Sequence, residues 1–368
     1  MQRKNGSEEV VNKFSGLSVI GAMVSVLFGS ALAATPPLKT DRAEVMKFFA
    51  ENVYGVDPDM TGFAKTCKVR DGGFDSKLNA CRRDVTLNVR TPIGDRMFTT
   101  LLLLPAAKKG TKVPCFVYLD FCRPEEHLGY PVTIEGEKKV WPVDTGTWPV
   151  RDILARGYAA ASFYYCDAFP DESKEIKDFG RSLTRPANGC GAINVWAMAS
   201  SRVMDYLETA PDIDAGKVAL VGLSRLGKTS LWACAKDTRF AYAVVNGSGC
   251  LGARATTRNV QGESIGAIVG NFPHWFAPNC RQFVGRDADL PFDQHWLVAM
   301  LAPRLVSIGS AEDDCWACPS GEHASYDLAR PAWGEQRNRA HYHIRCGGHD
   351  ILPEDWADYM DFARRHGW

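Results

Sequence analysis

Residues 217–232, KVALVGLSRLGKTSLW, contain the pattern that decides the fold class of this 368-residue chain. An apolar run typical of a buried strand leads into a turn with Gly222 and Ser224, and a helical pattern follows the turn. A sharp turn here projects the serine Oγ beyond the carboxyl end of the strand. Small residues are needed around it because neighbouring backbone comes very close. The stretch therefore predicts an accessible nucleophile at the edge of a parallel sheet.

Segments with strand and helix patterns alternate on both sides of this stretch. Strands are expected over 85–92, 97–105, 112–120, 158–165, 217–223, 240–247, 304–311 and 341–347. Helices are expected near 41–52 and over 150–157, 191–209, 225–235 and 356–366. Such alternation predicts an α/β fold, with a mostly parallel central sheet and helices on both faces. We expect a single domain over 34–368, with an N-terminal extension over about 34–84.

The first 33 residues have the pattern of a secretory signal peptide. A polar start with Arg3 and Lys4 precedes an apolar run over 17–34, in which Ala31-Leu32-Ala33 matches a cleavage site. An uncleaved membrane anchor is the alternative, although the run is barely long enough to span a bilayer. We expect cleavage after Ala33, a periplasmic or secreted protein, and no membrane contact afterwards.

Charge and cysteine content limit the classes of partner and cofactor. The chain has 43 Lys and Arg against 43 Asp and Glu, so no net positive charge favours a nucleic-acid partner. Export makes disulfides plausible among the twelve cysteines, and Cys67 and Cys81 are the favoured local pair. Cys315 and Cys318 form a C-x-x-C motif that could be a redox pair or half a zinc site. Because no second ligand pair follows at zinc-finger spacing, we expect no metal and no cofactor.

The letters GLSRLGKT, residues 222–229, also fit the phosphate-binding loop pattern G-x(4)-G-K-[ST]. That loop usually opens a nucleotide-binding domain near its N-terminus, whereas this stretch lies about two-thirds along the chain. An exported protein also lacks a ready supply of ATP. We therefore favour a hydrolase over a nucleotide-binding protein. The serine turn is then a nucleophile elbow of the α/β-hydrolase type, with Leu226 where the usual G-x-S-x-G pattern has its second glycine.

An elbow serine needs an acid and a histidine later in the chain, in that order. His349 lies between the last expected strand and the closing helix, where the general base belongs. Three acidic residues, Glu312, Asp313 and Asp314, follow the preceding strand, and a count of three from Gly309 favours Glu312. Spacing alone does not choose among them.

In such a triad the acid orients the imidazole, the imidazole accepts the serine proton, and N–H groups stabilise the oxyanion. The backbone N–H of Arg225, directly after Ser224, is one expected oxyanion donor.

The elbow and several later motifs together resemble the glucuronoyl esterases, carbohydrate esterase family fifteen. The elbow run is VGLSRLGKTSLWA, and the resemblance covers roughly residues 140–368 and is closer to the bacterial branch than to the fungal one. The later motifs, in order, are SGC (248–250), GES (262–264), FPHWF (272–276), LPFDQHWLVAMLAPR (290–304), SAEDDCW (310–316) and GGHD (347–350).

This resemblance implies an exported α/β-hydrolase that cleaves esters between glucuronic acid side chains of xylan and lignin alcohols. It implies Ser224 as nucleophile and His349 as general base, with Arg225 helping to form the oxyanion hole. Substrate-binding roles are implied for four further residues: Lys228 and Glu263 on sugar hydroxyls, Trp316 on the sugar ring, and His295 in the pocket lining. Charged hydrogen-bonding groups suit sugar hydroxyls, and an indole suits the apolar face of a sugar.

The chain departs from the fungal pattern in ways that bear on the acid. Fungal members carry a catalytic glutamate where this chain has Gly247, and glycine cannot orient a histidine. The acid must then come from the later acidic turn, as bacterial members allow, and alignment on Asp-x-Trp favours Asp314. The fungal disulfide beside the serine cannot form, because residue 223 is leucine. The second oxyanion donor is not identified by the sequence.

Two other functions remain open at this stage. One is an esterase for other plant-polysaccharide esters, such as acetyl or feruloyl groups; Lys228 and Glu263 argue for a uronate sugar instead. The other is a carbohydrate-binding relative without turnover, which Gly247 favours and the intact Ser224 and His349 oppose. We expect a carbohydrate ester as substrate and a monomeric protein.

Overall fold

The computed structural model describes residues 35–106, 110–129, 132–134, 137–139, 147–182, 185–258 and 261–368. The signal peptide expected over 1–33 lies outside the described residues. Within the described part of the chain, no helix is both long and apolar enough to cross a bilayer.

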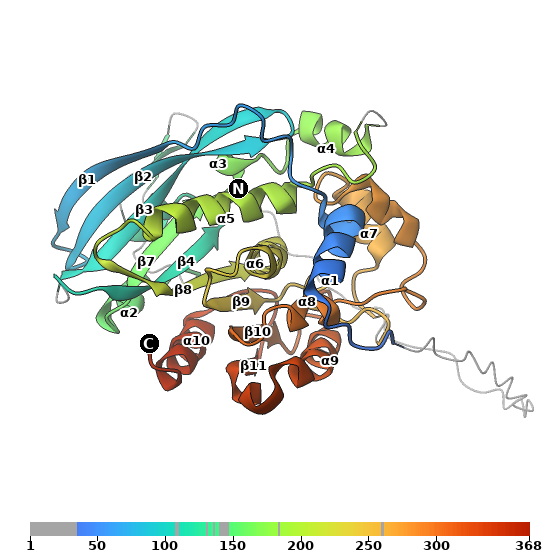
Figure 1. Cartoon of the computed structure of the whole chain (residues 1–368). Helices are drawn as coiled ribbons and strands as arrows, with labels where there is room; N and C mark the ends of the chain where they lie inside the picture. The colour runs from blue at the N-terminus through green and yellow to red at the C-terminus, as the bar shows by residue number, and fades with distance from the viewer. Residues whose placement is uncertain are drawn as a thin grey trace, which may run out of the picture. The chain divides into compact units, whose positions relative to one another are not determined.

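A nine-stranded sheet forms the centre of the fold (Figure 1). Its spatial order is β1-β2-β3-β7-β4-β8-β9-β10-β11. From β7 to β11 all neighbouring strands are parallel, whereas β1, β2, β3 and β7 pair antiparallel. The strands are β1 (Cys67–Asp75), β2 (Ala80–Thr91), β3 (Gly94–Pro105), β4 (Val113–Asp120), β7 (Ala159–Tyr164), β8 (Ile213–Leu223), β9 (Tyr242–Asn246), β10 (Leu305–Ala311) and β11 (Ala340–Arg345). A separate short hairpin joins β5 (Val132–Ile134) and β6 (Glu137–Lys139).

Helices follow or connect most of these strands. The α-helices are α1 (Arg42–Phe49), α2 (Val150–Ala155), α3 (Tyr165–Ala168), α4 (Lys174–Arg181), α5 (Ala192–Leu207), α6 (Arg225–Lys236), α7 (Ile265–Asn271), α8 (His295–Ala299), α9 (Pro319–Ala329) and α10 (Pro353–Arg365). A π-helix, η1 (Ala50–Tyr54), continues α1, and the 3-10 helices are η3 (Pro124–Leu128), η4 (Pro278–Phe283) and η5 (Arg330–Arg339).

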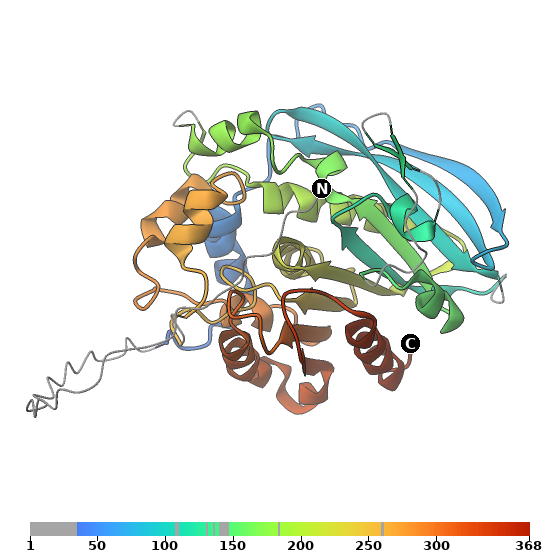
Figure 2. The ribbon, with the colours of Figure 1, turned by 180° about the vertical axis from the view of Figure 1, so that it is seen from behind.

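Each face of the sheet is buried against its own set of helices, as the alternation of strands and helices predicts. Side chains alternate along β4, so that Val117 and Leu119 enter one apolar core while Phe116 and Tyr118 enter the other. Helices α5 and α6 cover the first face (Figure 1), and α2 and α10 cover the second (Figure 2). Burial on both faces is typical of a parallel sheet and explains its near-continuous apolar strands.

Helix α6, which starts directly after Ser224, is fixed by a fully buried tryptophan. The Trp232 indole N–H donates to Asn194 Oδ1 of α5 at 2.7 Å, and its ring stacks on Tyr54 at 4.7 Å between centroids. Truncation of such a side chain to alanine costs about 3–5 kcal/mol of stability. The N-terminal segment therefore packs onto the same helix that begins at the elbow serine.

The sequence placed the parallel strands well but missed strand β1. The hairpin expected over 85–92 and 97–105 is present as β2 and β3, with Thr91 opposite Gly94. Strand β1 lies inside the expected N-terminal extension, and its first eight residues are all exposed. Its run CKVRDGGFD has no apolar alternation, because neither face of this edge strand is buried, and a bulge interrupts its pairing between Asp71 and Gly73.

The expected disulfide between Cys67 and Cys81 is wrong. The register of β1 on β2 places Cys81 opposite Phe74 and Cys67 opposite Leu87, so the two thiols lie well apart along the hairpin. All twelve cysteines lie within the described residues, and all of them are free.

Candidate active site

Ser224 occupies a strained turn between β8 and α6. Its backbone φ of 60° and ψ of −124° are unusual for a residue with a side chain, and such strain concentrates at functional sites. The turn requires glycine nearby: a Cβ on Gly222 would lie 2.0 Å from the Leu226 carbonyl oxygen, and one on Gly227 would lie 2.8 Å from that of Asn246. The glycine one position later than in G-x-S-x-G thus serves the close approach of α6 to β9.

The histidine and one acidic residue meet at the carboxyl ends of β11 and β10. The His349 Nδ1 lies 2.5 Å from Asp314 Oδ2, with the histidine side chain 38% exposed and the aspartate 3% exposed. Asp314 also accepts the Ala317 N–H at 3.1 Å. Burial by itself would raise the pKa of Asp314, but these hydrogen bonds and the nearby positive charges lower it overall. The carboxylate is therefore held ionised against the imidazole.

The other two acidic residues of this turn point elsewhere. Glu312 and Asp313 are exposed, and the Glu312 carboxylate accepts a hydrogen bond from the Cys346 thiol at 3.3 Å. The Asp314 N–H donates to Ala311 O at 3.1 Å, a short turn that rotates the third acidic residue inward. The structure thus places Asp314, rather than Glu312 or Asp313, on the histidine.

Ser224 and His349 line one cavity of about 220 Å³ at the carboxyl edge of the sheet. Most residues singled out by the sequence meet there. The cavity lining includes Ser224, Arg225, Lys228, Glu263, Trp316 and His349.

Gly247 lies directly beside the histidine and the aspartate. It has a φ of +48°, and a Cβ at this position would lie 3.4 Å from both Asp314 Oδ2 and His349 Nδ1. A longer side chain at 247 would therefore occupy the space that Asp314 now fills. An acidic side chain at position 247 and the one at Asp314 would reach the same edge of the His349 imidazole. Glycine at 247 therefore leaves this edge free for Asp314.

Lys228 and Glu263 are two buried groups of opposite charge that line the cavity. Their side chains are 4% and 5% exposed, and the Lys228 ammonium donates to the Ser248 carbonyl oxygen. Burial lowers the pKa of Lys228 and raises that of Glu263, and the charge of each group opposes the shift of the other. Both groups are thus held at a wall where a polar ligand could complete their hydrogen bonding.

Trp316 forms the rim of the cavity and is 58% exposed. Its carbonyl oxygen accepts the Glu263 N–H at 3.1 Å, and its indole hydrogen-bonds to the Glu263 carboxylate. The indole face is therefore held open to solvent at the entrance, as a ring that stacks on a sugar requires.

Sequence reasoning missed Asp171, which holds the Arg225 side chain. Asp171 is buried and accepts hydrogen bonds from His274 Nε2 at 2.8 Å, Trp275 Nε1 at 2.6 Å and the Tyr165 hydroxyl at 2.8 Å, and it pairs with the Arg225 guanidinium. Burial by itself would raise the pKa of Asp171, but these donors and the arginine charge lower it to about 2.

The guanidinium of Arg225 is also enclosed by aromatic rings. It lies 4.8 Å from the Trp275 ring centroid, 5.5 Å from that of Phe272 and 5.6 Å from that of Phe121. These contacts fix a permanent positive charge at the wall of the cavity, next to the nucleophile.

Glu322 of α9 is a second residue that the sequence did not single out. It is fully buried and accepts hydrogen bonds from Ser248 Oγ at 3.0 Å, the Gly249 N–H at 2.9 Å and Ser310 Oγ at 2.7 Å. Burial raises the pKa of Glu322. The residue fixes the loop 247–249 that lines the cavity. The sequence around Glu322 does not predict this role, because its partners come from β10 and from the loop after β9.

His295 is not among the residues that line this cavity. It opens α8, is fully buried, and lies near Asp293 and the backbone of Pro36. Asp293 in turn accepts the backbone N–H groups of Thr256 and Thr257 at 2.8 Å each. The structure therefore places His295 in buried packing around Asp293 and not in the cavity lining.

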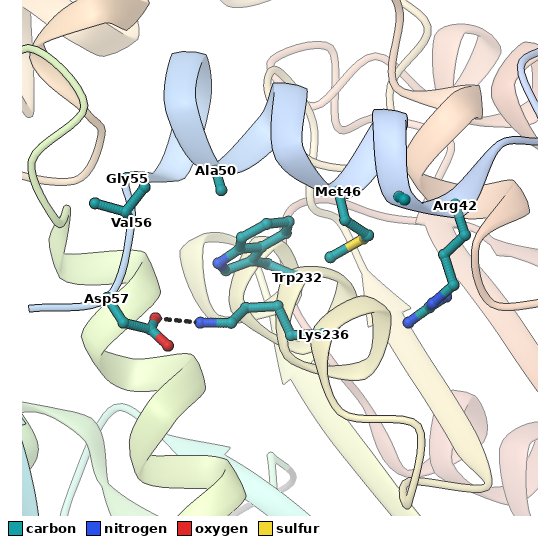
Figure 3. Close-up of a pocket in the computed structure, with 9 residues that line it drawn as sticks. Arg42, Met46, Ala50, Gly55, Val56, Asp57, Trp232 and Lys236 are labelled. Atoms are coloured by element: carbon teal, nitrogen blue, oxygen red, sulfur yellow. Dashed lines mark hydrogen bonds and ion pairs between the residues drawn. The ribbon is translucent and has the colours of Figure 1, made fainter. Parts of the chain in front are cut away.

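A larger cavity of about 570 Å³ lies between α1 and α6 (Figure 3). Met46 and Trp232 provide apolar walls, and Lys236 pairs with Asp57 at one side. Ser224 and His349 do not line it, so it is separate from the candidate active site.

The fold and the site together define a class. A parallel sheet with a serine elbow after β8, an aspartate after β10 and a histidine after β11 has the order and placement of an α/β-hydrolase.

Comparison with known proteins narrows this class. Residues 135–335 match the family model described as glucuronyl esterase, fungi. Carbohydrate esterase MZ0003, from an unknown prokaryotic organism, is 34% identical over an alignment of 377 positions, which covers 88% of this chain and 84% of the relative. A solved glucuronoyl esterase from Solibacter usitatus superposes with a TM-score of 0.77 at 30% identity, over 92% of this chain and 98% of that chain. The chain belongs to the glucuronoyl esterase family, carbohydrate esterase family 15.

The similarity to fungal members covers less of the chain. The 4-O-methyl-glucuronoyl methylesterase of Podospora anserina is 28% identical over 207 residues, which are 52% of this chain and 42% of the relative. The prokaryotic matches extend over most of the chain, in agreement with the bacterial character that the motifs imply. By family the chain is a carboxylic ester hydrolase.

Proposed function

We propose that this chain hydrolyses esters of glucuronic acid, of the kind that join glucuronoxylan side chains to lignin alcohols. The observation that supports it best is the composition of one cavity, where Ser224 and His349 lie together with Lys228, Glu263 and Trp316. A nucleophile and a base provide ester cleavage, and the charged pair and the indole provide recognition of a sugar.

The proposed mechanism proceeds through an acyl-enzyme. Ser224 Oγ attacks the uronoyl carbonyl carbon while His349 accepts the hydroxyl proton. Asp314 keeps its hydrogen bond to Nδ1, so that Nε2 is the nitrogen left to exchange protons. The protonated imidazole then donates to the departing alcohol. A water molecule, activated by the same histidine, finally hydrolyses the acyl-enzyme and releases the uronic acid.

Hydrogen-bond donors that are already in place stabilise the negative charge that develops on the carbonyl oxygen. The backbone N–H of Arg225 lies at the first residue of α6, and its guanidinium lies in the cavity wall, held by Asp171. Donors that are fixed before the reaction cost no reorganisation in the transition state, and each is worth about 10²–10³ in kcat.

The test is hydrolysis of benzyl glucuronate by the chain and its Ser224→Ala variant, with an acetyl ester as the control substrate. We expect uronate ester cleavage that falls by several orders of magnitude in the variant while ligand binding persists. Cleavage of the acetyl ester alone would keep the hydrolase and reject the uronate substrate. No cleavage of either ester would favour the binding relative without turnover.

A second pair of variants tests the substrate side separately. Lys228→Ala and Glu263→Gln should weaken hydrolysis of the uronate ester far more than that of a small acetyl ester, because only the uronate carries the hydroxyls that they bind. Equal losses on both substrates would assign this pair a structural role.

Export is part of this proposal, since the polymeric substrate lies outside the cell. The supporting observation is the signal-peptide pattern ending at Ala33. N-terminal sequencing of the protein recovered from the periplasm or medium should begin at Ala34. Recovery of the whole activity in the cytoplasm with an intact leader would contradict it.

A further inference from the structure

A second group of chemically active side chains lies in the loop that follows β4. Asp120 is the last residue of β4, Cys122 lies in the turn after it, and His127 belongs to the 3-10 helix η3. The aspartate and the histidine are 1% and 2% exposed, whereas the cysteine is half-buried. None of the three lines the cavity that contains Ser224. The proposed ester hydrolysis therefore leaves this cluster unused.

The three side chains point their ligand atoms at one another. Cys122 Sγ lies 3.0 Å from His127 Nε2 and 3.4 Å from Asp120 Oδ1. The same Nε2 lies 3.2 Å from Asp120 Oδ1 and 3.0 Å from Oδ2. The Cys122 thiol can donate to Oδ1 and the His127 N–H to Oδ2, so two protons hold these three groups together in the metal-free protein. A cation between the three groups would accept a lone pair from each.

The arrangement also differs from a catalytic triad. In a triad the acid and the nucleophile hydrogen-bond to opposite nitrogens of the imidazole. Here Asp120 and Cys122 both lie on the Nε2 side of His127. The imidazole therefore cannot accept the thiol proton at one nitrogen while the carboxylate holds the other nitrogen. This arrangement disfavours a nucleophilic role for the cysteine.

The spacing of the three atoms suits a tetrahedral metal site. Zinc binds sulfur at about 2.3 Å, and imidazole nitrogen and carboxylate oxygen at about 2.0–2.2 Å, so neighbouring ligands lie about 3.3–3.6 Å apart. The observed separation of 3.4 Å for sulfur to oxygen already lies in this range, and that of 3.0 Å for sulfur to nitrogen has to widen by about 0.5 Å.

The surroundings supply the second set of contacts that metal ligands need. Ser162 Oγ donates to Asp120 Oδ2 at 3.0 Å, and the Cys122 backbone N–H donates to Oδ1 at 3.1 Å. The Trp148 ring meets the His127 imidazole edge to face at 5.7 Å. Such contacts orient ligands and raise metal affinity. The half-buried cysteine leaves one side by which an ion can enter.

We propose that Asp120, Cys122 and His127 bind one transition metal ion of the zinc class, with a further coordination position filled by water or another donor. Thiolate and imidazole ligands select zinc or cobalt over magnesium and calcium, which prefer oxygen ligands alone. Burial, followed by the charge of Asp120, raises the pKa of the Cys122 thiol, and a bound cation reverses this because it stabilises the thiolate. In the sequence only Cys315 and Cys318 stand out as candidate metal ligands, and no metal is expected from the sequence.

The position of the site gives the ion a mechanical role. Strand β4 pairs with β8, which ends at Leu223, directly before Ser224. Phe121 lies between two of the three ligands in sequence. The Phe121 ring lies 5.6 Å from the Arg225 guanidinium. An ion held by Asp120 and Cys122 therefore fixes the backbone that carries this ring. It acts on the loop and not on the ester.

The experiment uses the tag-free chain, stripped with a chelator and dialysed against buffered zinc, with metal content measured by mass spectrometry. We expect about one zinc ion per chain. His127→Ala and Cys122→Ser should each lower the affinity by at least about tenfold. Cobalt bound in place of zinc should show thiolate-to-metal charge-transfer absorption that Cys122→Ser abolishes.

Two matched variants control for surface binding. Cys67→Ser removes an exposed thiol, and His341→Ala removes a histidine that pairs with Asp358 at 2.7 Å without a cysteine nearby. Both should keep the full zinc content. The wild-type chain alone gives a readout that does not depend on variant folding, since zinc should slow alkylation of Cys122 as mapped by peptide mass. Unchanged alkylation, or zinc binding equal in all variants, would overturn the proposal.

Discussion

Asp314 is the residue on which the catalytic assignment depends most. It reaches His349 Nδ1, whereas its neighbour Asp313 is exposed. We expect Asp314→Asn to lower kcat by about three to four orders of magnitude, as loss of the triad acid does elsewhere. Asp313→Asn, the matched control, should change kcat less than twofold. Equal losses at both positions in steady-state assays with benzyl glucuronate would reject Asp314 as the acid.

The Asp171 carboxylate should give the protein a measurable pH dependence of stability. Its pKa is lowered from 3.8 to about 2, so its stabilising effect is complete above the unfolded value and is lost as the pH falls towards 2. Above pH 4 the wild type should exceed Asp171→Asn by about 2 kcal/mol in free energy of unfolding. Urea titrations between pH 2 and 6 measure this difference. A difference that stays constant across the range would show that the carboxylate charge is not the cause.

The sequence could predict the elbow because that signal is local. Gly222, Ser224, Gly227 and the flanking apolar pattern lie within a few residues of each other, so the elbow is visible in one short stretch. Asp171 could not be found in this way. Its partners Arg225 and His274 lie 54 and 103 residues away, and only the packed fold joins them. Spacing does not choose Asp314 over Glu312, because the choice depends on the turn that the Asp314 N–H makes to Ala311. The resemblance to the family did favour Asp314, through the Asp-x-Trp motif.

At the scale of elements, the loop after β9 is strained where it meets the candidate catalytic residues. Gly247 has a φ of +48°, where a Cβ costs about 1–2 kcal/mol, and that Cβ would touch His349 and Asp314. Gly247→Ala should therefore lower the free energy of unfolding by about that amount and also reduce kcat. Urea unfolding and steady-state kinetics of the same preparation measure both. A variant as stable as the wild type would mean that the loop relaxes without cost.

The parallel strands were predictable and the outer elements were not. Strands buried on both faces, such as β4 and β8, are continuous apolar runs that stand out from the helices between them. Strand β1 lacks that signal because its residues face solvent on both sides. The helices α7 and α8 are too short to show a helical period, so the sequence pattern does not predict them.

The whole molecule is held together without covalent cross-links among its described residues, which include every cysteine. Stability therefore comes from the two apolar cores on either side of the sheet. In denaturant and without reductant, twelve thiols per chain should react with a thiol reagent such as DTNB. The melting temperature should not change when reductant is added. Fewer than twelve reactive thiols, with a melting temperature lowered by reductant, would reveal bridges.

The exposed edge formed by β1 has a consequence for how these molecules meet in concentrated solution. A second chain that tried to add its own strand there would find a ladder interrupted at Asp71 and Gly73, and side chains such as Lys68 and Arg70 facing outward. Charged side chains on an edge strand oppose the addition of another strand. The irregularity and the charges of this border therefore oppose growth of the sheet from one molecule to the next, which is how fibrils form.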